Sequence, residues 1–173
     1  MSNRNALIGA SALAIRLAMV ANGCFIAAIG AGLVASLALG GHFTTLLLGP
    51  DLAGDIAGTT TGMRCLMLTG LAAAALIQYI ALVLGRILAA VAADDPFAVT
   101  NAGRIRRIAW ALLAFQMLDV PMMAIRHAFP GLGNAAPDTG LSPGGWLAVL
   151  MMFVLARIFT TGTSMRDYLR ETI

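Results

Sequence analysis

Four long apolar stretches, separated by short polar connections, define the pattern of this chain. The hydrocarbon core of a bilayer is about 30 Å thick, and a helix needs about 20 largely apolar residues to cross it. The four stretches meet that length and predict membrane spans at residues 17–39, 65–93, 108–129 and 144–165. We therefore predict an all-α integral membrane four-helix bundle that occupies residues 1–173 as a single domain.

The composition agrees with this pattern. Hydrophobic residues make up 60% of the 173 positions and charged residues only 11%, and the mean hydropathy is +0.88. Charged residues make up about 25% of an ordinary soluble domain. Because the four predicted spans use most of the chain, no room remains for a separate soluble domain.

The distribution of basic residues predicts how the spans are oriented. All eleven are arginines; nine flank one side of the four spans, and only Arg64 and Arg126 flank the other. Short cytoplasmic loops carry an excess of basic residues. We therefore expect the nine-arginine side to face the cytoplasm from a bacterial inner membrane, with both termini on that side. This side attracts anionic lipid headgroups, whereas direct nucleic-acid binding is not expected, because no basic fold is large enough to dock a duplex.

Polar residues inside the spans are costly and suggest a function by default. Asp119 lies in the third span and Arg157 in the fourth, and the helical rise places them at similar depths. We predict an Asp119–Arg157 ion pair, joined by Gln78 or Gln116, and a kink at Pro121, which removes a backbone hydrogen bond. The pair either holds the two spans together, the interpretation we favour, or acts as a proton- or ligand-sensitive switch.

The inner connection between the second and third spans predicts a short interfacial helix that leads into the third span. Asp95 can accept hydrogen bonds from the free N–H groups of a helix start, and Pro96 fits its first turn. Together with the C-terminal helix, this segment forms a predicted docking face for an acidic cytoplasmic protein. For the C-terminal segment taken by itself, a helix that is solvated or bound to headgroups is the interpretation we favour. The predicted face comprises Asp95, Pro96, Phe97, Asn101, Arg104, Arg106, Arg107, Arg166 and Arg170.

Two groups of residues carry a resemblance to a known family. In the inner connection they are Asp95-Pro96-Phe97, Asn101, Arg104-Ile105-Arg106, Ile108 and Trp110. Near the C-terminus they are Phe159, Gly162, Met165-Arg166-Asp167 and Thr172-Ile173. This pattern resembles a bacterial membrane family catalogued as domain of unknown function 2975. The resemblance implies a small inner-membrane protein, often encoded beside a small helix-turn-helix transcription regulator, with no established catalytic activity.

The sequence lacks the motifs of several common catalytic and metal sites. It contains no His-Glu-x-x-His zinc motif, no glycine-flanked serine elbow and no phosphate-cradling glycine loop. An aspartyl intramembrane protease needs two carboxylates that share the chemistry, and only Asp119 lies deep enough in a span. His42 and His127 have no local ligand motif for haem or copper. We therefore expect no catalytic residues, no metal and no cofactor.

Two hypotheses for function follow. The first is a non-enzymatic membrane protein that regulates or sequesters a cytoplasmic helix-turn-helix transcription regulator. The second is a ligand- or ion-handling membrane subunit that uses the Asp119 region, which would need oligomerisation because four spans alone make a thin transporter. Gly32, Ser36 and Gly40 are spaced by four and allow a close helix contact. We expect that contact inside the bundle, and a homo-oligomer seam is the alternative.

Overall fold

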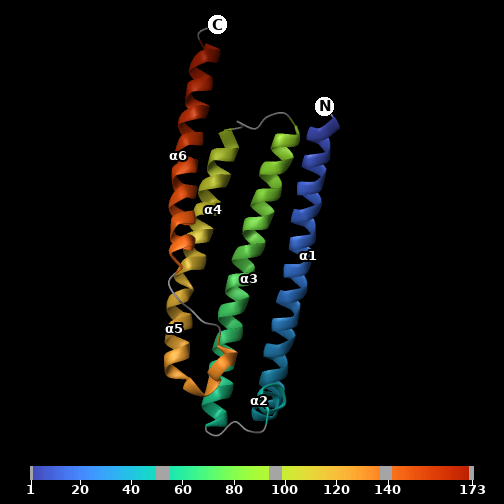
Figure 1. Ribbon diagram of the computed structural model, residues 1–173, viewed down its shortest axis with the longest axis vertical. Coiled ribbons are helices and arrows are strands. Elements are labelled where there is room, and N and C mark those ends of the chain that lie inside the picture. The colour runs from blue at the N-terminus through green and yellow to red at the C-terminus, as the bar shows by residue number, and fades with distance from the viewer. Residues whose placement is uncertain (1, 50–54, 94–98, 137–141, 172–173) are drawn as a thin grey trace. The chain divides into compact units, whose positions relative to one another are not determined.

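The computed structural model describes residues 2–49, 55–93, 99–136 and 142–171, and within these ranges every regular element is a helix (Figure 1). The elements are α1 (Ser2–Leu39), α2 (Gly41–Leu48), α3 (Ile56–Ala92), α4 (Val99–Met117), α5 (Asp119–Ala128), the 3₁₀ helix η1 (Pro130–Ala135) and α6 (Pro143–Glu171). Residues 99–107, where a short helix leading into the third span was predicted, form the first turns of α4, which continues into that span.

Four helical segments are long and apolar enough to cross a membrane. They are Ala6–Leu39, Ile56–Ala92, Thr100–Ala128 and Pro143–Gly162. The predicted all-α, four-span architecture is therefore confirmed. The first two segments begin well before the predicted spans, because α1 and α3 remain helical and apolar on both sides of Arg16 and Arg64.

The surface of these segments is as apolar as their composition requires. Leu7, Leu17 and Leu150 keep 64%, 61% and 63% of their surface exposed, and many other large apolar side chains do the same. Monomeric soluble proteins rarely expose large continuous apolar patches. Hydrocarbon solvates such side chains without cost, so we describe the chain as a multi-pass membrane protein.

Contacts between residues divide the chain into two compact units. Unit 1 consists of Met1–Ala21, Leu76–Gln116 and Ser142–Ile173, and unit 2 consists of Asn22–Ala75 and Met117–Leu141. Helices α1 and α3 each contribute one part to each unit. The organisation of residues 1–173 as a single domain stays a prediction.

In unit 1, α4 contacts both the C-terminal part of α3 and α6. The rings of Trp110 on α4 and Phe153 on α6 meet edge to face, with centroids 5.3 Å apart and planes at 88°, an arrangement that aromatic rings favour. Farther along the same pair of helices, the Gln116 side chain lies directly over Gly145, where an added Cβ would come within 2.5 Å of the carboxamide. Small residues thus let α4 and α6 approach closely.

In unit 2, the segment after α5 folds back onto α3. Met63 on α3 is 6% exposed and Leu132 on η1 is 3% exposed, and together with Ala136 they form a buried apolar cluster. Gly62 makes this contact possible, since a Cβ there would lie 2.7 Å from Cγ of Phe129 and 2.9 Å from Cδ1 of Leu132. The turn after the third span is therefore held by side-chain packing as well as by its backbone.

The third span is interrupted at Leu118, which separates α4 from α5. Leu118 keeps helical angles, with φ −69° and ψ −15°. Pro121 has no N–H to donate to the carbonyl of Met117, so the ladder misses one bond there. It resumes with the Met122 N–H donating to the Leu118 carbonyl at 3.2 Å. The interruption lies beside Asp119, where the kink was predicted.

Candidate functional site

The charges of the chain divide unevenly between the two units. Unit 1 holds nine arginines and four acidic residues, whereas unit 2 holds two arginines and four acidic residues. The nine arginines of unit 1 are the same nine that flank one side of the predicted spans. Unit 1 is therefore basic and unit 2 acidic, and the candidate site is the basic surface of unit 1.

A hydrogen-bonded brace fixes the first turns of α4 against α3. The Arg104 guanidinium donates from Nη1 to Oδ1 of Asn101 at 2.8 Å and to the backbone carbonyl of Arg86 at 3.2 Å. Asn101 is 1% exposed, and Arg104 is half-buried. The predicted docking face needs a correction here: the side chain of Asn101 lies inside unit 1, and Arg104 binds its own chain. Both residues hold α4 in place, and the part of the predicted docking face that a partner could contact is smaller by these two side chains.

Arg106 and Arg107, one turn farther on, are exposed. Arg106 helps to line a hollow of about 580 Å³ between α4 and α6. The other lining residues are Phe153, Ala156, Arg157, Thr160 and Thr161. Two exposed arginines thus meet in one hollow, and its lining contains no carboxylate. Because like charges held close together favour an anion between them, we call this surface the basic hollow and expect it to attract anionic groups.

The basic hollow also places Arg157. The α4–α6 contacts of unit 1 bring Arg157 beside Arg106, which precedes Asp119 by thirteen positions in the sequence. At a rise of about 1.5 Å per residue, that interval is about 20 Å along a helix. Arg106 is thus a neighbour of Arg157 that the sequence did not name. Asp119 is half-buried in the first turn of α5 and belongs to unit 2, so its pairing with Arg157 stays a prediction.

The two glutamines expected to support that pair both lie in unit 1. Gln116 is 8% exposed, and its Nε2 atom makes no hydrogen bond within the described part of the chain. A buried amide donor without an acceptor costs free energy. Gln78 is half-buried on α3. Their role as links between Asp119 and Arg157 stays a prediction.

A polar site in unit 2 was not predicted as a site. Arg64 on α3 donates from Nε to the hydroxyl of Ser36 at 3.0 Å and from Nη2 to the Ser36 carbonyl at 2.6 Å. Ser36 is fully buried in the last turn of α1. A cation near a helix C-terminus is favourable because it faces unsatisfied carbonyls. The spacing of Gly32, Ser36 and Gly40 indicated close approach inside the bundle, and Ser36 makes it, but nothing in the spacing named Arg64 as the partner.

The hydroxyl groups of Thr44 and Thr60 form a second buried link in unit 2. Their Oγ1 atoms lie 2.7 Å apart, and Thr60 also donates to the carbonyl of Ile56. Thr44 therefore donates to Thr60, since a hydroxyl has one proton. This bond holds α2 against the start of α3.

Several predicted residues fall outside what the structure describes. Asp95, Pro96 and Phe97 lie in the segment 94–98, which is not described. Arg166 and Arg170 lie on α6, and nothing is described of their side chains. Among the described residues, no group of three histidine, cysteine or acidic side chains could hold a metal ion. Cys24 and Cys65 are free thiols.

Comparison with known proteins gives one match. A family model described as protein of unknown function (DUF2975) matches residues 50–173, which is more than two thirds of the chain. The matched part begins after α2 and contains every residue of the basic hollow. No curated protein and no solved structure matches the chain.

Proposed function

Since the chain belongs to the DUF2975 family of proteins of unknown function, we propose that it is a non-enzymatic membrane protein that holds a cytoplasmic helix-turn-helix transcription regulator at the bilayer. Two observations support the proposal: the resemblance to the family and the basic surface of unit 1. The family pattern implies a gene that is often placed beside such a regulator, and the chain carries an exposed basic hollow suited to an acidic partner.

The observation that carries the proposal is the convergence of Arg106 and Arg157 in one hollow, next to Arg107. Charged residues at the rim of an interface steer association and fix its orientation. The brace from Arg104 to Asn101 and the Arg86 carbonyl supports this role, because it holds α4 in place before any partner arrives. A preorganised surface loses less entropy on binding.

The sign of the charge also says which side of a regulator would dock. A helix-turn-helix domain meets the phosphates of DNA with basic side chains. An acidic patch that fits the basic hollow therefore lies away from its DNA-reading helix. In this proposal the membrane protein acts by removing the regulator from the chromosome, and it leaves the DNA-contacting surface uncovered.

The proposal requires unit 1 to face the cytoplasm. Nine arginines in unit 1 against two in unit 2 support that orientation. Green fluorescent protein fused after Ile173 is expected to fluoresce, and alkaline phosphatase at the same place to be inactive, because the first folds in the cytoplasm and the second outside it. The reverse result, with phosphatase active and no fluorescence, would place the basic hollow outside and end the proposal.

Loss of the two exposed arginines on α4 is expected to release the regulator. The full chain would be purified from membranes in mild detergent together with the helix-turn-helix protein encoded beside it, and the bound regulator quantified per copy of chain. Exposed charge pairs contribute up to about 1 kcal/mol each, so Arg106→Gln with Arg107→Gln is expected to weaken binding about tenfold. The wild-type complex should also weaken as salt rises.

Arg126→Gln is the control, because Arg126 is exposed but belongs to unit 2. It removes one exposed arginine charge away from the basic hollow and should leave the bound regulator unchanged. Equal recovery of regulator with the α4 double variant and with wild type would refute docking at the basic hollow. Failure to recover any helix-turn-helix protein with the wild-type chain would refute the proposed function itself.

A further inference from the structure

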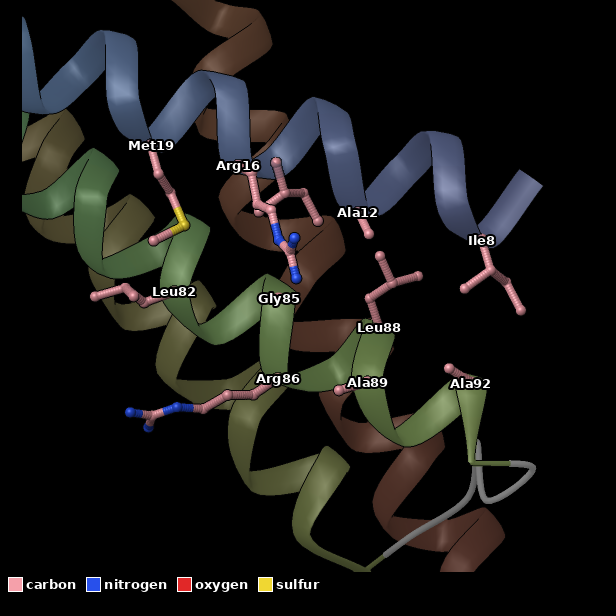
Figure 2. Close-up of a pocket in the computed structure, with 11 residues that line it drawn as sticks. Ile8, Ala12, Arg16, Met19, Leu82, Gly85, Arg86, Leu88, Ala89 and Ala92 are labelled. Carbon is pink, nitrogen blue, oxygen red and sulfur yellow. The ribbon is translucent and has the colours of Figure 1, made fainter. Parts of the chain in front are cut away.

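A second hollow in unit 1, separate from the basic hollow, lies between α1 and α3 (Figure 2). It has a volume of about 420 Å³, within the usual range for small-molecule sites. Its wall is apolar except for two arginines. The lining residues are Ile8, Ala12, Ile15, Arg16, Met19, Leu82, Gly85, Arg86, Leu88, Ala89 and Ala92.

The two arginines of this groove point in different directions. Figure 2 shows Arg16 reaching from α1 toward α3 at the level of Gly85, while the Arg86 guanidinium extends away from α1. A glycine at position 85 leaves this part of the wall without a side chain. No hydrogen bond or ion pair of Arg16 is found within the described part of the chain. Arg16 is therefore the arginine that faces across the groove, and within the described part of the chain its charge meets no partner.

The same two arginines mark one boundary of the membrane. The uncharged stretch of α1 begins directly after Arg16, and that of α3 runs from Cys65 and ends directly before Arg86. Arginines at such boundaries lie where the lipid phosphates are, and their stems reach across the apolar zone. Met19 and Leu82 line the groove on the uncharged side of this boundary. A single occupant would thus meet a cation and hydrocarbon at once.

We propose that the α1–α3 groove binds an anionic phospholipid, with its phosphate at Arg16 and one acyl chain along the apolar wall beside Met19 and Leu82. Basic pockets between membrane helices on the cytoplasmic side are suited to anionic headgroups. A free phosphate ion would satisfy Arg16 but leave the apolar wall empty. The groove lies between two helices that are long and apolar enough to span a membrane, so lipid is the solvent expected around it.

The test uses the full chain in dodecyl maltoside with an equimolar mixture of palmitoyl-oleoyl phosphatidylglycerol and phosphatidylcholine, and native mass spectrometry counts the lipids retained. Wild type is expected to retain phosphatidylglycerol preferentially. Arg16→Gln should lower the retained phosphatidylglycerol about fivefold, as roughly 1 kcal/mol per arginine at an anionic surface implies. Arg86→Gln is the matched control: it removes the same charge at the same boundary, but the Arg86 guanidinium extends away from α1 and from the proposed phosphate position, so this variant should retain the preference.

A second variant separates the groove from general charge attraction. Ala12 lines the groove, and Ala12→Phe would fill it while Arg16 stays in place. This variant is expected to lose the bound lipid as fully as Arg16→Gln, with an unchanged circular dichroism melting curve. Three results would each overturn the proposal: an unchanged lipid preference in Arg16→Gln, full retention in Ala12→Phe, or displacement of the lipid by inorganic phosphate. None of them bears on the basic hollow, so the proposed function is tested separately.

Discussion

Replacing Ser36 with alanine is expected to lower the free energy of unfolding by about 2 kcal/mol, because the Nε of Arg64 loses its acceptor and hydrogen bonds to charged groups contribute about 1.5–3 kcal/mol. Ser36 is fully buried, so no water replaces the lost hydroxyl. The second bond, from Nη2 of Arg64 to the Ser36 carbonyl, remains. The loss is measured by unfolding the purified chain with dodecyl sulfate in mixed micelles, followed by circular dichroism.

Arg64→Met is expected to cost less than Ser36→Ala, although it deletes both bonds. Removing the cation also removes its need for partners, whereas removing only the acceptor leaves a half-buried charge less well satisfied. The Ser36 hydroxyl can then bond back to the carbonyl one turn earlier. The double variant, Ser36→Ala with Arg64→Met, should have nearly the same free energy of unfolding as Arg64→Met alone. If the two single losses simply add, the Ser36–Arg64 bond is not a coupled interaction, and this account of unit 2 is wrong.

Replacing Gly62 with alanine is expected to lower the apparent melting temperature by several degrees. The added Cβ would lie 2.7 and 2.8 Å from Cγ and Cβ of Phe129, and overpacking of this kind costs about 1–3 kcal/mol. Because one of these atoms is a Cβ, rotating the side chain cannot relieve the contact fully. We expect η1 to separate from α3, and thermal unfolding in detergent, with light scattering as the aggregation control, measures the effect.

Gly70→Ala in the same helix is the matched control. Its Cβ would meet only Cδ1 of Ile29, at 3.5 Å, which is ordinary contact. Alanine has the higher helix propensity by up to about 1 kcal/mol, so this variant should melt at or above the wild-type temperature. Equal melting of the two alanine variants would mean that Gly62 does not set the approach of η1 to α3.

The four spans could be predicted because their signal is local. A run of apolar residues and the arginines that flank it are read from neighbouring positions, and the structure agrees at all four spans. The sequence signal for the interruption beside Asp119 is equally local, since Pro121 removes a hydrogen bond to the carbonyl four residues earlier. Arg106 and Arg107 stand between the apolar residues Ile105 and Ile108, which are buried, and both arginines are exposed on the other side of α4.

Contacts between distant residues could not be predicted in the same way. The predicted depths of Asp119 and Arg157 follow from the helical rise within each span, which does not say how far one helix is shifted along another. The α4–α6 register goes with the packing of Trp110 on Phe153, a contact between two different helices. The inward direction of Asn101 likewise depends on the place of the Arg86 carbonyl on another helix. The α4–α6 register and the direction of Asn101 both depend on packing between helices, which cannot be predicted from the spacing of residues along one helix.

The weak burial of α1 has a consequence for how the protein is made. None of the residues in its most apolar 18-residue stretch is buried, and two of its polar side chains bond to α3, Asn22 to the Ala74 carbonyl at 2.9 Å and Ser36 to Arg64. Synthesis proceeds from the N-terminus, so α1 enters the bilayer before either partner has left the ribosome. Its outward side then needs no rearrangement when α3 arrives. During biogenesis α1 can therefore insert ahead of α3 on its hydrophobicity alone, and hydrogen bonds join the two helices afterwards.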